Sequence, residues 1–170
     1  MKLVKSEART AAASPANVLI TGESGTGKEL FAQAIHNASP RFAGPFVPIS
    51  CGGFSRETVD SILIGTEKNP GKFIQADGGT LFLDGISEMS QDMQSFLLRF
   101  LEDGIVTPIG SRRSVQTDVR VISAAGSEVL QKVKDGSFRL DLYYRLNVLR
   151  IDLPPLRERQ ADMQELSNYF

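Results

Sequence analysis

The chain has 170 residues, enough for one domain and short for two. Hydrophobic residues make up 41% and charged residues 23%, a globular composition that excludes intrinsic disorder. With 19 Lys and Arg against 20 Asp and Glu, the net charge of -1 excludes broad electrostatic binding to nucleic acid or anionic membranes. The single Cys51 excludes an internal disulfide, and the single His36 disfavours a histidine-based zinc site.

Apolar runs in the chain are short. None approaches the ~20 residues that a membrane-spanning helix needs. Residues 1–10 are charged and lack the apolar core of a secretory signal. We therefore expect a reduced, cytoplasmic protein with no membrane partner.

Short apolar runs alternate with longer segments of helical periodicity. Strands are predicted at residues 17–20, 46–49, 80–83, 119–123 and 148–153. Helices are predicted at residues 28–37, from Ser55 to Leu63, and from Ser90 or Asp92 to near Gly104. Pro48 weakens the second strand because it cannot donate to a sheet ladder. This alternation is typical of βαβ units, so the expected fold class is α/β, with three layers and a mainly parallel sheet.

A G-x-x-x-x-G-K motif at residues 22–28 lies between the first strand and the first helix, as a phosphate-binding loop requires. Glycines let backbone N–H groups converge on phosphate oxygens, and Lys28 reaches the terminal phosphates. The residues expected to bind the nucleotide are Gly22, Glu23, Ser24, Gly25, Thr26, Gly27, Lys28 and Glu29. Glu29 replaces the usual Ser or Thr magnesium ligand, which disfavours a generic P-loop GTPase. The alternative is a Gly-rich turn that only joins strand to helix.

The apolar run at 80–83 ends in a carboxylate, Asp84. An Asp at the end of such a strand can hold Mg²⁺ against the β- and γ-phosphates. The residues therefore predict a nucleoside triphosphate and Mg²⁺ as ligands, and the family resemblance described next implies that the nucleotide is ATP.

Four ordered motifs resemble the central AAA+ domain of sigma-54-dependent, NtrC-like bacterial transcription regulators. They are VLITGESGTGKE (18–29), QADGGTLFLD (75–84), FRLDLYYRLNV (138–148) and LPPLRER (153–159). The resemblance implies a P-loop NTPase fold, with an N-terminal segment at 1–14, the AAA+ domain at 15–160 and the start of a truncated helical lid at 161–170. It also implies ring oligomers that hydrolyse ATP between subunits and remodel sigma-54 RNA polymerase. Glu29 matches the Glu that follows the P-loop lysine in this family.

The chain departs from the family where hydrolysis takes place. The family's water-activating Glu aligns with Gly85, its Thr-Asn sensor aligns with Ala125 and Gly126, and the Asn that restrains the Glu aligns with Ser50. Glycine cannot accept a proton, and general-base help is typically worth ~10²–10⁴-fold. We expect weak hydrolysis or none, unless another carboxylate such as Glu88 replaces the missing one.

The family's sigma-54-contacting loop falls between Lys68 and Gly71. Its Gly-Ala-Phe-Thr-Gly-Ala signature is missing here, and only Asn69 and Pro70 close the gap. We therefore expect no sigma-54 contact through this loop. Relatives of the tyrosine-responsive repressor type are similar in lacking the loop and act without sigma-54.

Arg139 and Arg145 align with the family's trans-acting arginines, which reach the γ-phosphate of a neighbouring subunit. The alternative is an ordinary ion pair with Asp141 or Glu158. The resemblance thus implies self-association, with DNA bound only through another domain. His36 is expected as a core or helix-end contact.

Three functions remain open. The first is a nucleotide-binding regulatory module that hydrolyses ATP poorly. The second is an active ATPase that remodels sigma-54 polymerase. The third is a structural domain that binds no nucleotide.

Overall fold

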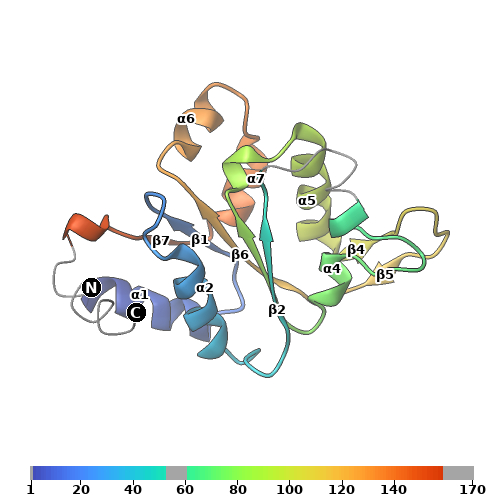
Figure 1. The fold of residues 1–170 in the computed structure, drawn as a ribbon, viewed down its shortest axis with the longest axis horizontal. Helices are drawn as coiled ribbons and strands as arrows, with labels where there is room; N and C mark the ends of the chain where they lie inside the picture. The colour runs from blue at the N-terminus through green and yellow to red at the C-terminus, as the bar shows by residue number, and fades with distance from the viewer. Residues whose placement is uncertain (1, 53–60, 159–170) are drawn as a thin grey trace.

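The computed structural model describes residues 2–52 and 61–158 (Figure 1). The strands are β1 (Val18–Thr21), β2 (Phe46–Ser50), β3 (Thr80–Asp84), β4 (Ile105–Val106), β5 (Val115–Gln116), β6 (Arg120–Ala125) and β7 (Leu149–Asp152). The helices are α1 (Lys2–Ala13), α2 (Lys28–Asn37), α4 (Lys72–Gln75), α5 (Gln91–Asp103), α6 (Val129–Lys134) and α7 (Leu140–Leu146), with 3-10 turns η1 (Ile86–Glu88) and η2 (Leu156–Glu158). None of the helices in these described residues is long and apolar enough to cross a membrane.

Within the described residues, five parallel strands form the central sheet in the order β2-β3-β6-β1-β7. Thr21 at the end of β1 lies opposite Ala125 of β6, and Asp84 at the end of β3 lies opposite Ala124. The carboxyl ends of β1, β3 and β6 therefore meet at one edge of the sheet. Pro48 lies in β2 at the side of the sheet, where only one neighbour needs hydrogen bonds.

Side chains alternate between the two faces of the sheet and build a core on each. Leu81 and Leu83 of β3 face a core shared with α5 and α7, whereas Phe82 faces a second core shared with α1 and α2. Figure 1 shows these helices on opposite sides of the strands. The three-layer α/β fold predicted from the sequence is confirmed.

Helix α1 occupies most of the N-terminal segment 1–14, for which no helix was predicted. Ala11 and Ala12 are each 2% exposed and belong to the second core. Arg120 of β6, 3% exposed, donates from Nη2 to Ala11 O at 2.5 Å and from Nε to Ala16 O at 3.3 Å. A cation at a helix C-terminus compensates the unpaired carbonyls there, so α1 is anchored to the sheet.

The segment from Gly65 to Gly71 is a tight turn. Thr66 N donates to Asn69 O at 2.8 Å, and Asn69 N donates to Thr66 O at 3.2 Å. Gly65 has φ 80° and accepts from Ile109 N at 2.9 Å, which ties the turn to the β4–β5 hairpin. The chain therefore crosses from Gly65 to Gly71 without a protruding loop. Of the helix predicted between Ser55 and Leu63, residues 61–63 are helical and the rest lie outside the described residues.

Candidate nucleotide-binding site

The phosphate loop connects the end of β1 to the start of α2. Gly25 and Gly27 have φ 77° and 84°, a left-handed backbone that only glycine adopts without strain. Nothing lies within 4 Å of a Cβ placed on Gly25, so the loop is open on that side. Gly27 is the N-cap of α2 and has no side chain to cap the helix. The first turn of α2 therefore directs backbone N–H groups and a positive dipole end toward the loop.

Lys28 folds back into this loop. Its Nζ donates to Gly22 O at 3.0 Å and to Glu23 O at 2.9 Å. Both acceptors are neutral carbonyls, and a phosphate oxygen would offer a stronger, charge-assisted bond in their place. The loop, the helix end and Lys28 together fit a nucleotide polyphosphate.

Asp84 lies half-buried at the carboxyl end of β3. In the sheet, β6 lies between β3 and β1. No group of three or more His, Cys, Asp or Glu in the described residues could hold a metal by itself. Mg²⁺ commonly combines one or two carboxylates with phosphate oxygens and water, so Asp84 fits a metal that arrives with a nucleotide. The expected roles of Asp84 and of residues 22–29 stay predictions.

A cavity of about 240 Å³ adjoins the phosphate loop. Its walls come from the ends of β1, β6 and β7, and they include Gly22, Gly126, Leu130 and Leu153. Ligand sites usually measure ~300–1,000 Å³. This cavity is therefore smaller than a typical complete ligand site.

Gly85 follows Asp84, at the position where the resemblance led us to expect a catalytic Glu. Its φ of 72° turns the chain into η1, and Glu88 N closes that turn by donating to Gly85 O at 2.9 Å. A Cβ placed on Gly85 would have open space, with Glu88 Cδ 4.0 Å away as its nearest neighbour. The site therefore lacks a side chain at this position but has a carboxylate beside it.

Gly126 follows β6, at the position where the resemblance led us to expect a polar sensor. A Cβ there would overlap the carboxylate of Glu128. Ser87 Oγ donates to Glu128 Oε1 at 2.7 Å and lowers the pKa of Glu128, and Lys132 Nζ donates to Ser87 O at 2.8 Å. This contact joins the segment after β3 to the segment after β6. The sequence offers no signal for it, because the partners are 41 residues apart.

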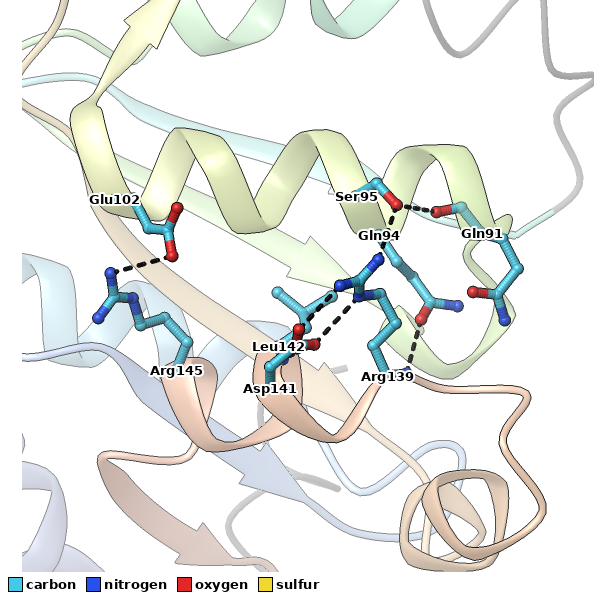
Figure 2. A network of polar contacts seen from close by, with 8 residues as sticks. All are labelled: Gln91, Gln94, Ser95, Glu102, Arg139, Asp141, Leu142 and Arg145. Carbon is cyan, nitrogen blue, oxygen red and sulfur yellow. Dashed lines mark hydrogen bonds and ion pairs between the residues drawn. The ribbon is translucent and has the colours of Figure 1, made fainter.

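The side chain of Arg139 is bound by residues of its own chain. Figure 2 shows its guanidinium paired with Asp141, from Nε to Oδ1 at 3.0 Å and from Nη2 to Oδ2 at 2.8 Å, while Nη1 reaches Ser95 Oγ at 3.2 Å. The hydrogen bonds from Arg139 lower the pKa of Asp141 to about 2. Of the two ion-pair partners named from the sequence, Asp141 is thus the one found. To reach a neighbouring nucleotide, Arg139 must leave Asp141.

Arg145 is held more loosely. Its Nη2 lies 3.5 Å from Glu102 Oε1 on α5, and both side chains are about half exposed, at 48% and 53% (Figure 2). Arg145 makes one ion pair at 3.5 Å, whereas Arg139 makes two shorter hydrogen bonds to Asp141, so Arg145 can exchange its partner more easily.

His36 lies in the core, and Cys51 lies beside the end of β3. His36 is 2% exposed, and its Nδ1 lies 2.9 Å from Thr80 Oγ1, which confirms the predicted core contact. Cys51 is half-buried after β2, and burial, with the charges of Asp84 and Glu88, raises the pKa of its thiol. The thiol therefore stays protonated and is not a nucleophile.

The chain was compared with known proteins. The Sigma-54 interaction domain family matches residues 1–152. The DNA-binding transcriptional regulator NtrC of Escherichia coli K12 is 47% identical over 163 residues, which are 91% of this chain and 35% of that protein. The transcriptional regulatory protein TyrR of Citrobacter braakii is 48% identical over 172 residues, which are 100% of this chain and 34% of that protein. This chain therefore spans about a third of the length of these relatives.

Among solved structures, NtrX from Brucella abortus in complex with ATP superposes with a TM-score of 0.93 at 34% identity. The match covers 99% of this chain and 40% of the NtrX chain. The family match and these relatives agree with the motifs, the parallel sheet and the phosphate loop. The chain belongs to the Sigma-54 interaction domain family, the AAA+ P-loop NTPase domain of NtrC-like transcriptional regulators.

Proposed function

We propose that this chain is an ATP-sensing module of a bacterial transcription regulator. It binds ATP with Mg²⁺ through residues 22–29 and Asp84, hydrolyses the nucleotide slowly, and uses the bound nucleotide to control self-association. The observation that carries this proposal is the phosphate loop, in which Lys28 is bonded only to the neutral carbonyls of Gly22 and Glu23 among the described residues. The ATP and ADP complexes of NtrX support a nucleotide as the ligand.

Slow hydrolysis follows from the residues that stand at the reaction centre. Gly85 has no carboxylate, and Gly126 has no polar side chain to contact a γ-phosphate. Loss of a general base alone costs ~10²–10⁴-fold in rate. Binding is carried by other residues, so it survives these replacements.

Self-association is the proposed output because Arg139, the N-cap of α7, and Arg145, in its last turn, align with the family's trans-acting arginines. A planar guanidinium stabilises phosphate charge well and cannot deprotonate. Arg145, with its looser ion pair, is the first candidate to contact a neighbour's nucleotide. Asp141 already binds Arg139 through two hydrogen bonds. Arg139 therefore contacts a neighbour's nucleotide only when a phosphate binds the guanidinium more strongly than the Asp141 carboxylate does.

The tight turn at Gly65–Gly71 argues against sigma-54 contact by the loop that the family uses. The similarity to TyrR as well as NtrC is compatible with a regulator that acts without this contact. We place the protein in the cytoplasm, and we assign DNA binding to another domain of a longer regulator.

Sedimentation velocity with and without ATP and Mg²⁺ tests the proposal. We expect larger species with ATP, a loss of this response in Lys28→Ala and Arg145→Ala, and a normal response in the control Arg112→Ala. An association state that ignores ATP would support the structural domain instead. ATP turnover at the rate of active AAA+ relatives would support the remodelling ATPase.

A further inference from the structure

We propose that Glu88 activates the attacking water in place of the carboxylate that Gly85 lacks. The inference rests on the proposed ATP binding and names the group responsible for the slow hydrolysis.

The backbone after β3 brings Glu88 back toward the strand end. Gly85 turns the chain with φ 72°, and η1 is a single 3-10 turn closed by the bond from Glu88 N to Gly85 O at 2.9 Å. Glu88 Cδ consequently lies 4.0 Å from the point where a Cβ of residue 85 would stand. A Glu at position 85 would carry its own carboxylate into this same region.

Gly52 leaves space for the Glu88 carboxylate because it has no side chain. Gly52 follows β2, and a Cβ placed on it would overlap Glu88 Oε2. The Glu88 carboxylate therefore rests against the backbone of Gly52, between the ends of β2 and β3. Asp84, the proposed metal-binding residue, ends β3 and is paired in register with Ser50 of β2.

The Glu88 carboxylate is also available for chemistry. It is exposed, and no described residue donates a hydrogen bond to it or forms an ion pair with it. The neighbouring Glu128 differs, because Ser87 Oγ donates to it at 2.7 Å. Glu88 can therefore accept a proton from a water molecule without first breaking a contact with any of the described residues.

The proposed step is a single displacement. Water attacks the γ-phosphorus of ATP, and one proton of the water passes to the Glu88 carboxylate. The bond between the γ-phosphorus and the β–γ bridging oxygen breaks. ADP and inorganic phosphate leave, and the proton on Glu88 is released to solvent. A positioned base contributes ~10²–10⁴-fold to such a step.

Single-turnover hydrolysis of ATP with Mg²⁺, measured beside calorimetric binding of ATP, tests this role. We expect Glu88→Gln to slow hydrolysis by about 10²-fold while ATP binding is unchanged. The control Glu67→Gln, an exposed Glu in the turn after Gly65, should match the wild type. Added formate should restore part of the rate in Glu88→Ala, because a small external carboxylate can replace a missing base but cannot repair a structural defect.

Two results would overturn the assignment while leaving ATP binding intact. One is an unchanged rate in Glu88→Gln. The other is a wild-type rate no higher than that of Lys28→Ala. If the wild type fails to bind ATP at all, the proposed function fails first, and the inference about Glu88 falls with it.

Discussion

Arg157 donates two parallel hydrogen bonds to the carboxylate of Glu23, from Nη1 to Oε2 at 2.9 Å and from Nη2 to Oε1 at 3.0 Å. Glu23 belongs to the phosphate loop, and Arg157 lies in η2, after β7. The hydrogen bond from Arg157 is the main cause of the lowered pKa of Glu23. The pair neutralises a carboxylate that would otherwise repel the phosphates of a bound nucleotide.

Replacing Arg157 should therefore weaken ATP binding through charge. We expect Arg157→Ala to lose about five- to tenfold in affinity at low ionic strength, and less at high salt, where screening is stronger. Calorimetric titration at two salt concentrations measures both effects. Adding Glu23→Gln to Arg157→Ala should restore the affinity, since it removes the uncompensated charge. Equal affinities for the wild type and Arg157→Ala at low salt would contradict this account.

A carboxylate at position 85 should speed hydrolysis. A side chain there has room, because the nearest atom to its Cβ is Glu88 Cδ at 4.0 Å. The φ of 72° makes the substitution strained by about 1–2 kcal/mol, which lowers stability without blocking the site. We expect Gly85→Glu to raise ATP turnover by at least about tenfold. The control Gly85→Gln carries the same strain without a base, so equal turnover in both variants would rule out this explanation.

A polar side chain at position 126 should lower the stability of the fold. Because a Cβ on Gly126 overlaps the Glu128 carboxylate, Gly126→Asn must push Glu128 away from Ser87. We expect a loss of about 1 kcal/mol in the free energy of unfolding, the typical value of one hydrogen bond. Denaturant unfolding measures this. In a Glu128→Ala background the same substitution should cost much less, and an equal cost in both backgrounds would show that the overlap is unimportant.

His36 should make the fold sensitive to mild acid. Burial lowers its pKa, and Arg120 nearby acts in the same direction. Because the folded-state pKa lies below the ordinary 6.5, the unfolded chain binds more protons as the pH falls. The stabilisation is present above about pH 6.5 and is lost as the pH falls toward the lowered pKa. Urea unfolding between about pH 5 and 8 should show this slope, and His36→Gln should reduce it. A slope unchanged in His36→Gln would assign it to other groups.

The sequence predicted the central elements well because their patterns are strong. The runs at 80–83 and 119–123 were predicted as strands, and they form β3 and β6. A helix was predicted from Ser90 or Asp92 to near Gly104, and Ser90 and Gly104 cap α5: Ser90 Oγ accepts from Met93 N, and Gly104 has φ 67°.

Other features of the structure have no pattern in the sequence that predicts them. The buried face of α1 includes the small residues Ala11 and Ala12, and no helix was predicted there. Glu23 and Arg157 are 134 residues apart and exposed, and only the folded chain brings them together. Glu88 could be named as a candidate carboxylate from its distance to Asp84. Its position beside Gly85 and Gly52 depends on the 3-10 turn η1, which no sequence pattern predicts.

The central claim is that the phosphate loop binds ATP. Its most direct test is a calorimetric titration of the chain with ATP and Mg²⁺, beside Lys28→Ala and the control Lys72→Ala, a lysine on α4. We predict micromolar binding in the wild type and in Lys72→Ala, and none in Lys28→Ala. Binding that survives in Lys28→Ala would contradict the claim. So would the absence of heat from the wild type.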